Sequence, residues 1–155
     1  MVKTSAGLLL FRRRATGIEF FLVHPGGPFW AKKDEGAWSI PKGEYDASEN
    51  PLQAADREFT EETGIVARGY RVPLGEFRQP GGKRITAWMV EFDCDPAVIK
   101  SNTFTMEWPP KSGRQQEFPE VDRAGWFGPL AATKKLVKGQ RPIIERALSL
   151  LATRL

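Results

Sequence analysis

The sequence predicts a single α/β domain over residues 1–155, in which a mixed β-sheet lies between helices. Three observations support this fold class. Apolar runs of strand length alternate with turn residues in the first part of the chain, one capped amphipathic helix follows, and helical patterns return at the end. At 155 residues with 41% hydrophobic residues, the chain is long enough for one buried core. The order of strands, helix, strands and helices is typical of a sheet covered by helices.

The strands are predicted from short apolar segments bounded by turn residues. Six segments have this character: residues 4–11, 18–24, 38–40, 70–77, 84–92 and 124–127. The fourth and fifth are expected to form a hairpin around Pro80-Gly81-Gly82. The long stretch 95–116, which contains Pro109-Pro110, is expected to be irregular for much of its length.

The first helix is predicted from its end signals. Asn50 is a good N-cap, Pro51 suits the first helical position, and Gly64 supplies the left-handed residue that commonly ends a helix. An apolar stripe runs between these ends, formed by Leu52, Ala55 and Phe59. Two further helices are predicted at 130–137 and 142–155.

The first helix ends in a cluster of carboxylates. Glu58 and Glu62 are i and i+4, and Glu61 is i+3 from Glu58, so their side chains are neighbours. Like charges at this spacing destabilise a helix by roughly 0.2–0.5 kcal/mol per pair. A hard divalent cation such as Mg²⁺ or Mn²⁺ prefers oxygen ligands and would offset this repulsion. The alternative is a solvated acidic face, which is the usual interpretation of a charge run.

The charge of the rest of the chain favours a metal site over a solvated face. Residues 43–65 carry seven acidic side chains and one basic one, a local charge of −6, so the remaining chain carries +10 out of a total of +4. An acidic segment in an otherwise basic protein suits a metal-loaded site that receives a polyanion.

Residues 43–65, GEYDASENPLQAADREFTEETGI, resemble the signature of the Nudix hydrolases, G-x5-E-x7-R-E-U-x-E-E-x-G-U, where U is a bulky aliphatic residue. Every fixed position matches, and the one soft departure is the aromatic Phe59. The resemblance implies a Nudix α/β/α sandwich. It also implies divalent-metal-dependent hydrolysis of a phosphoanhydride bond in a nucleoside diphosphate linked to another group.

The resemblance also implies roles within the segment. Glu58 and Glu62 are expected to be metal ligands, and Gly43 is expected to let the backbone approach the metal, with a plain turn as the alternative. Glu61 is the candidate general base, although members of the family differ in which carboxylate serves. Arg57 is expected to pair with a carboxylate of the segment, such as Glu49 or Glu61.

Outside residues 43–65, the resemblance implies an additional acidic ligand or base on the loop before the last strand. Glu120 fits this role better than Glu117, against the alternative of a solvated loop carboxylate. Lys42, Lys83 and Arg84 are candidates for phosphate contact, against ordinary surface charge.

Aromatic residues near the site are candidates for base stacking, although most aromatic side chains pack in cores. The candidates are Phe29, Trp30, Trp38 and Trp108, of which Trp38 is assigned to the substrate site. His24, the single histidine, is expected to be structural.

The segment Trp38-Ser39-Ile40-Pro41-Lys42-Gly43 resembles the W-x-x-P-K-G motif of Nudix enzymes that act on diadenosine polyphosphates and diphosphoinositol polyphosphates. A dinucleoside polyphosphate or a nucleoside triphosphate is therefore the favoured substrate. The alternatives are an ADP-ribose or oxidised-dNTP pyrophosphatase, an RNA 5′-pyrophosphohydrolase, and a non-catalytic nucleotide-binding module. Such modules usually lose the carboxylates that this chain keeps.

The remaining expectations concern partners and location. A single Cys94 fits a reducing cytoplasm, no apolar run approaches the ~20 residues of a membrane span, and the N-terminal residues are in the wrong order for a signal peptide. The basic balance, with a pI near 9.4, favours anionic partners, and the expected partner is a small-molecule nucleotide substrate. A nucleic-acid partner is left open but not favoured, and the oligomeric state is left open.

Overall fold

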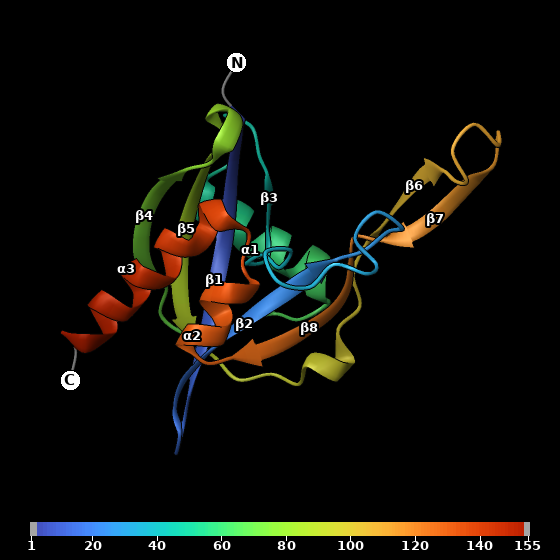
Figure 1. The fold of residues 1–155 in the computed structure, drawn as a ribbon. Helices are drawn as coiled ribbons and strands as arrows, with labels where there is room; N and C mark the ends of the chain where they lie inside the picture. Colours follow the sequence, from blue (N-terminus) through green and yellow to red (C-terminus); the bar gives the residue numbers. More distant parts are fainter. Residues whose placement is uncertain (1–2, 154–155) are drawn as a thin grey trace.

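The computed structural model describes residues 3–153. Within that range, a six-stranded sheet has the order β4-β5-β1-β2-β8, and β3 pairs with β1 beside β2 (Figure 1). The strands are β1 Thr4–Arg14, β2 Gly17–Pro25, β3 Lys42–Glu44, β4 Val72–Arg78, β5 Arg84–Glu91 and β8 Val121–Phe127. β1 runs parallel to β5 and antiparallel to β2 and β3, so the predicted mixed sheet is confirmed.

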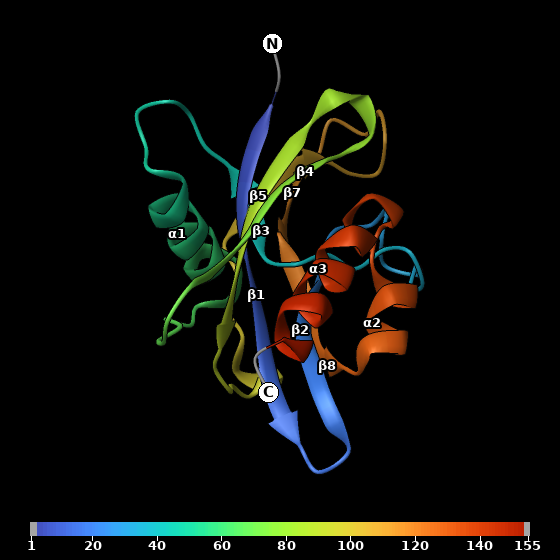
Figure 2. The ribbon, with the colours of Figure 1, turned by 90° about the vertical axis from the view of Figure 1, so that its left-hand side faces the viewer.

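Helices cover both faces of this sheet. Helix α1, Pro51–Thr63, lies on one face, and α2, Pro129–Lys135, and α3, Arg141–Ala152, lie on the other (Figure 2). Short 3-10 turns join the elements: η1 Pro80–Gly82, η2 Pro96–Val98 and η3 Lys138–Gln140. The predicted sandwich of helices around a sheet is therefore confirmed. Among residues 3–153, no helix is both long enough and apolar enough to cross a membrane.

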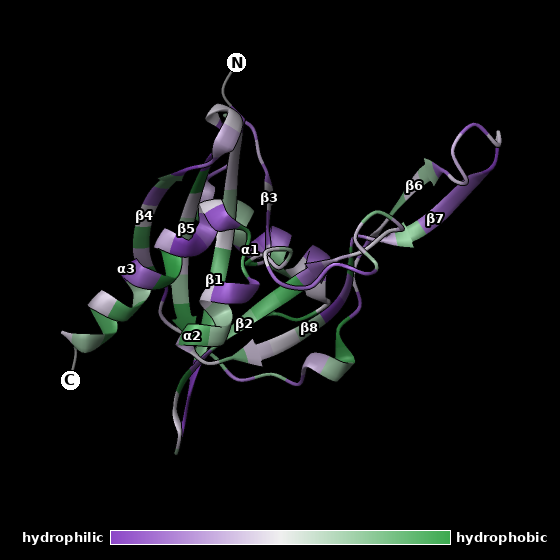
Figure 3. Ribbon diagram, in the orientation of Figure 1, coloured by the Kyte–Doolittle hydropathy of each residue, from purple (hydrophilic) through white to green (hydrophobic). Residues whose placement is uncertain are grey.

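The two core layers follow from the alternation of side chains along the central strand. Leu8 and Leu10 of β1 belong to the cluster on the α1 side, whereas Leu9 and Phe11 belong to the cluster on the α3 side. A strand buried on both faces reads as a continuous apolar run, which is the pattern of residues 6–11. The hydropathy colouring shows the same concentration of apolar residues in the central strands (Figure 3).

Helix α1 begins and ends as its sequence predicts. The side chain of Asn50 accepts hydrogen bonds from the backbone N–H of Leu52 at 2.9 Å and of Gln53 at 3.3 Å. Gly64 has φ 74°, and its N–H donates to the carbonyl of Thr60 at 2.7 Å. Because both caps are local in sequence, they are visible without the fold.

Residues 95–116 are irregular for much of their length, as predicted, but they also contain strand residues of a two-stranded arm that was not predicted. Strands β6, Thr103–Glu107, and β7, Gln115–Pro119, pair with each other and project from the body of the molecule (Figure 1). The aromatic pair of the arm, Phe104 opposite Phe118, is its main apolar content, so the stretch is too polar to read as a strand. The predicted strand at 38–40 is wrong, because it makes only isolated bridges, and the regular strand is β3.

Candidate active site

The acidic end of α1 lies directly against β3. A Cβ atom at Gly43 would overlap the carboxylate of Glu58, so the absent side chain is what lets Glu58 lie over the strand. Gly43 pairs with Ala6 of β1, which fixes β3 to the centre of the sheet. The glycine is therefore required for space.

Arg57 is the hub of a carboxylate network at this end of the helix. Its Nε and Nη2 donate to the two oxygens of Glu49, both at 2.8 Å. Its Nη1 donates to Glu58 Oε1 at 2.8 Å and to both oxygens of Glu61 at 3.2 Å. The bond to Glu49 is the largest cause of the raised pKa of Arg57, and it lowers the pKa of Glu49. The predicted pairing of Arg57 therefore includes Glu49 and Glu61, and Glu58 as well.

Two carboxylates of the segment are held partly out of water. Burial raises the pKa of Glu58, whose side chain is 11% exposed, and this outweighs the opposite effect of the hydrogen bond from Arg57. The pKa of Glu62 is raised to about 8, mainly by burial, with the charges of Glu58 and Glu120 acting in the same direction and Lys42 in the opposite one. One oxygen of Glu62 accepts a hydrogen bond from the backbone N–H of Lys42 at 3.2 Å. These acids lie in a low-dielectric setting, where an added cation would be strongly attracted.

Glu120 reaches the same place from the other side. A recess of about 100 Å³ is lined by Glu62, Glu120, Lys42 and Ser39 together with apolar residues. The main chain of Glu120 is fixed there, because its N–H donates to Asn102 at 2.8 Å and its carbonyl accepts from Gly26 at 2.9 Å. Glu117, in contrast, is an exposed residue of the arm.

The donor set fits a hard divalent cation that keeps part of its own shell. Among residues 3–153, no group of three or more His, Cys, Asp or Glu side chains is arranged so that it could hold a metal ion by itself. Mg²⁺ does not need such a group, because it is usually held by one or two carboxylates together with waters and substrate phosphates. Glu58 and Glu62, whose pKa values are raised by burial, supply oxygen donors of that kind.

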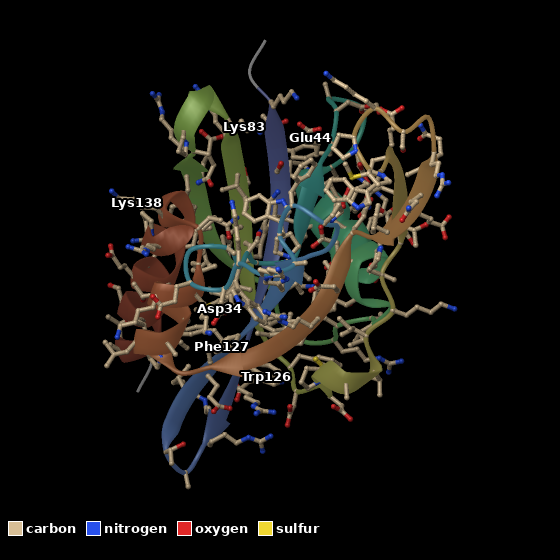
Figure 4. The ribbon with its side chains drawn as sticks, turned by 45° about the vertical axis from the view of Figure 1, so that its right-hand side comes forward. Asp34, Glu44, Lys83, Trp126, Phe127 and Lys138 are labelled. Atoms are coloured by element: carbon tan, nitrogen blue, oxygen red, sulfur yellow. The ribbon has the colours of Figure 1, made fainter. Side chains whose placement is uncertain are left out.

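A basic cleft adjoins the acidic recess. The cleft has a volume of about 400 Å³, and its described lining includes Lys42, Lys83 and Arg84 and no acidic residue. Three residues, Pro25, Ser39 and Lys42, line both the cleft and the recess. Lys83 stands at the end of the β4–β5 hairpin, away from Glu44 on the other side of β1 (Figure 4). The structure thus gathers the three predicted phosphate-contact residues on one side of the recess.

A family model for the NUDIX domain matches residues 1–147. The chain belongs to the NUDIX family. It is 34% identical over 103 residues to the asymmetrical bis(5′-nucleosyl)-tetraphosphatase of Rattus norvegicus, a match that covers 59% of this chain and 66% of that enzyme, just under two thirds. It is 28% identical over 130 residues to the RNA pyrophosphohydrolase of Photobacterium profundum, covering 79% of this chain and 74% of that protein.

Solved structures support the same assignment at the level of the fold. The binary complex of the C. elegans Ap4A hydrolase superposes on this NUDIX domain with a TM-score of 0.68 at 23% identity, over 98% of this chain and 99% of that one. The NUDIX domain of Shewanella oneidensis NrtR, in complex with ADP ribose, superposes with a TM-score of 0.66 at 17% identity, over 97% and 89%. The α/β/α sandwich is therefore the fold of the family.

Trp38 does not lie where the motif suggests. The NUDIX domain buries this side chain, which is 4% exposed, and its Nε1 donates to Asp34 Oδ1 at 2.8 Å. Its ring packs edge-to-face with Phe127 at 5.0 Å and with His24 at 5.2 Å. The assignment of Trp38 to the substrate site is therefore wrong, because the side chain packs in the core and lines neither the cleft nor the recess. Trp30, 38% exposed, lines the cleft instead.

His24 has the structural role that the sequence predicts. It is fully buried, with Nδ1 at 2.8 Å from Asp122 Oδ1 and Nε2 at 2.6 Å from the carbonyl oxygen of Lys33. Because Asp122 belongs to β8 and Lys33 to the loop after β2, the imidazole fastens that loop to the sheet.

Two glutamines of the NUDIX domain contribute to the site and are not identified by any pattern in the sequence. Gln140 is 2% exposed; its Oε1 accepts from the Ile40 N–H and its Nε2 donates to Ser39 Oγ, both at 2.9 Å. Gln79 Nε2 donates to the Gly139 carbonyl at 2.8 Å. Both side chains line the cleft. Their partners are 100 or 101 positions away for Gln140 and 60 for Gln79, so no local pattern identifies them.

Proposed function

We propose that this NUDIX domain hydrolyses a phosphoanhydride bond of a dinucleoside polyphosphate or a nucleoside triphosphate, in a reaction that requires Mg²⁺ or Mn²⁺. The observation that carries the proposal is that Lys42 lines both the basic cleft and the acidic recess. A polyanion that binds along the cleft therefore brings one phosphate next to Glu62 and Glu120. The names of the relatives from Rattus norvegicus and C. elegans support a substrate of this class.

Glu58 and Glu62 would hold the cation, which would neutralise phosphate charge and polarise the phosphoryl group. Lys42, Lys83 and Arg84 bind the remaining phosphates and hold the chain along the cleft. The protein mainly positions the reactants and stabilises charge, as in other phosphoryl transfers.

We propose that a carboxylate of the site acts as the general base and accepts a proton from the attacking water. Glu61 is our first choice, and Arg57 Nη1 holds its carboxylate in place. Glu120 is the second, because it faces the recess and no donor among the described residues binds its carboxylate. Arg57 orients Glu58 and Glu61 together, so its role is to fix the geometry of the site.

A second candidate is an RNA 5′-pyrophosphohydrolase. It is favoured by the match to the Photobacterium profundum protein, which covers more of this chain than the match to the tetraphosphatase does. The same recess would serve, since a 5′-triphosphate offers the same bonds. An ADP-ribose or oxidised-dNTP pyrophosphatase and a non-catalytic nucleotide-binding module are less favoured.

We also propose that residues 1–155 form one domain and that it acts in the cytoplasm. The single, half-buried Cys94 supports the location.

Initial rates on a panel of substrates test the proposal. The panel contains Ap4A, ATP, 8-oxo-dGTP, ADP-ribose and a 5′-triphosphorylated RNA, each assayed with Mg²⁺ and after exhaustive chelation with EDTA. We expect the highest kcat/KM for Ap4A or ATP, and loss of turnover with EDTA. Full turnover after chelation would disprove the metal requirement, and a higher kcat/KM for RNA would select the second candidate.

A further inference from the structure

We propose that the aromatic pair formed by the exposed Phe29 and the half-buried Trp108 is a second nucleobase site. It takes the distal nucleoside of a dinucleoside polyphosphate whose phosphates lie in the basic cleft. The inference rests on the proposed function and names the part of the substrate that lies outside the cleft.

The two rings come from distant segments and meet at the surface. Phe29, in the loop after β2, is 62% exposed, and Trp108 follows β6 at the start of the turn of the arm. Their centroids are 5.5 Å apart with an interplanar angle of 83°, an edge-to-face arrangement. The ring of Phe29 stays largely in water, and an exposed aromatic face is a surface on which a base can stack.

The pair is held by the backbone beneath it. Gly27 has φ +96°, and a Cβ there would meet Phe104 Cζ of the arm at 2.9 Å. The neighbouring N–H of Gly26 donates to the carbonyl of Glu120 at 2.9 Å. On the other side, the N–H of Trp108 donates to the Arg114 carbonyl at 2.9 Å, which closes the turn of the arm. A fixed platform loses little entropy when a base stacks on it, which favours binding.

The platform continues from the wall of the cleft. Trp30, the residue after Phe29, lines the cleft, and Lys33 Nζ lies 5.1 Å from its ring centroid. The cleft holds about 400 Å³, near the small end of the roughly 300–1,000 Å³ of ligand sites. This space suits one nucleoside with its phosphates, so the second nucleoside must lie beyond the rim. Phe29, adjacent in the chain to the cleft-lining Trp30, brings the aromatic pair to this side of the cleft.

Paired ligands that differ by one nucleoside test the inference. The ligands are non-hydrolysable methylene-bridged analogues of Ap4A and of adenosine 5′-tetraphosphate, which share four phosphates. Their dissociation constants are measured by calorimetry for the wild-type protein, Phe29→Ala and Trp108→Ala. We expect each substitution to weaken binding of the Ap4A analogue by about 10-fold, the typical loss for one stacked base, and to leave the tetraphosphate analogue unchanged.

Two kinds of control variant accompany these measurements. Tyr70→Ala removes an aromatic ring that is 77% exposed but lines neither the cleft nor the recess, and it should bind both analogues as the wild type does. Phe29→Tyr and Trp108→Phe keep an aromatic face and should restore most of the affinity. Thermal melting of each variant identifies any loss of binding that comes from unfolding.

Equal weakening for both analogues, or no weakening for either, would overturn the inference. It would also be overturned if Phe29→Ala and Trp108→Ala weakened binding of a 5′-triphosphorylated dinucleotide and left the Ap4A analogue unaffected. The proposed function fails separately, if the wild-type protein does not hydrolyse Ap4A or ATP. The analogue that carries two nucleosides would in that case still bind more tightly than its partner through the aromatic pair.

Discussion

Glu58 and Glu62 are acids that the fold places side by side and partly shields from water, and this placement has a measurable consequence in the metal-free protein. Burial raises the pKa of both groups, that of Glu62 to about 8. An acid with a raised folded-state pKa binds more protons in the folded state than in the unfolded state. Ionisation of the pair therefore works against folding, unless a cation compensates the charge.

The first prediction is that the metal-free protein loses stability as the pH rises from about 4.5, the ordinary carboxyl value, to about 8. The loss should level off above that pH, because Glu62 is then ionised in both states. Glu62→Gln, which cannot ionise, should flatten this part of the profile. The measurement is thermal melting in EDTA from pH 5 to 9, with the exposed Glu76→Gln as control. If the melting temperature of the wild-type protein instead rises across this range, the raised pKa of Glu62 is contradicted.

The second prediction separates the roles of the carboxylates. Glu61→Gln removes a basic oxygen with little change of shape, so kcat should fall by about 10²–10⁴ while metal affinity changes little. Glu58→Gln and Glu62→Gln should instead weaken metal binding, because each removes a charged ligand. Metal affinity and kcat, measured on the same three variants, check this. If Glu61→Gln keeps full activity, Glu120 is the next candidate for the base.

The third prediction concerns the space at Gly43. Gly43→Ala places a Cβ where the carboxylate of Glu58 lies, so either Glu58 or β3 must move. We expect weaker metal binding and a large loss of kcat, measured by calorimetry and initial rates. Gly128→Ala is the matched control, because nothing lies within 4 Å of a Cβ there. Equal activity of the two variants would show that the contact between Gly43 and Glu58 is unimportant.

At the scale of elements, residues 36–40 form a connecting segment, here called the strap, that leads to Lys42 at the junction of the cleft and the recess. The C-terminal segment holds this strap. The N–H of Trp38 donates to Lys135 at 2.9 Å, the N–H of Val137 donates to Trp38 at 2.8 Å, and Gln140 binds the strap through its side chain. A segment with little regular pairing of its own is thus fixed by residues from the other end of the chain.

The fourth prediction is that Gln140→Leu affects both stability and substrate binding. The substitution keeps the approximate size of the side chain but leaves the buried Ile40 N–H without its partner, at a cost of about 1–3 kcal/mol in the free energy of unfolding. Because Lys42 lies two residues further on, KM should rise for polyphosphate substrates. Chemical denaturation and steady-state kinetics measure the two effects. Gln115→Leu, on the exposed β7, is the control, and a KM unchanged in Gln140→Leu would argue against the positioning role.

The elements that were predicted from the sequence are those whose signals are local. The caps of α1, the carboxylates of its last turn and the strands of the central sheet depend on residues a few positions apart. The position of the arm and the burial of the Trp38 side chain depend on contacts between distant segments. Trp38 is covered by Phe127, and the aromatic contact of the arm with Phe29 spans 79 positions. Neither partner can be identified by periodicity, so these features required the fold.

At the scale of the whole molecule, charge is divided between one acidic segment and a basic remainder. Residues 43–65 carry −6 and the rest of the chain +10. The structure places part of this positive charge, Lys42, Lys83 and Arg84, in one cleft beside the acidic segment. The negative charge of the acidic segment alone would repel a polyphosphate. The positive charges of the cleft attract it, so it reaches the cleft before it meets the recess.

The fifth prediction is that binding of a polyphosphate weakens as salt rises. Exposed charges more than about 8–10 Å apart are screened at physiological ionic strength, so KM for Ap4A should increase between low and high salt. Lys42→Ala, Lys83→Ala and Arg84→Ala should raise KM more for Ap4A than for the shorter ADP-ribose. Steady-state kinetics over a salt series, with the exposed Arg146→Ala as control, provide the measurement. A KM for Ap4A that is independent of salt would contradict this view of the cleft.

The two ends of the projecting arm meet, because the N–H of Glu120 donates to the carbonyl of Asn102 at 2.8 Å. A segment whose ends are already joined can be lengthened, shortened or exchanged with only a small change in closure entropy, about 0.6 kcal/mol for each doubling of length. The arm can thus be exchanged at its joined ends, and its aromatic contact with the loop after β2 would change with it. During evolution, changes in the arm can therefore alter which substrate the domain binds, while the catalytic carboxylates of the body stay the same.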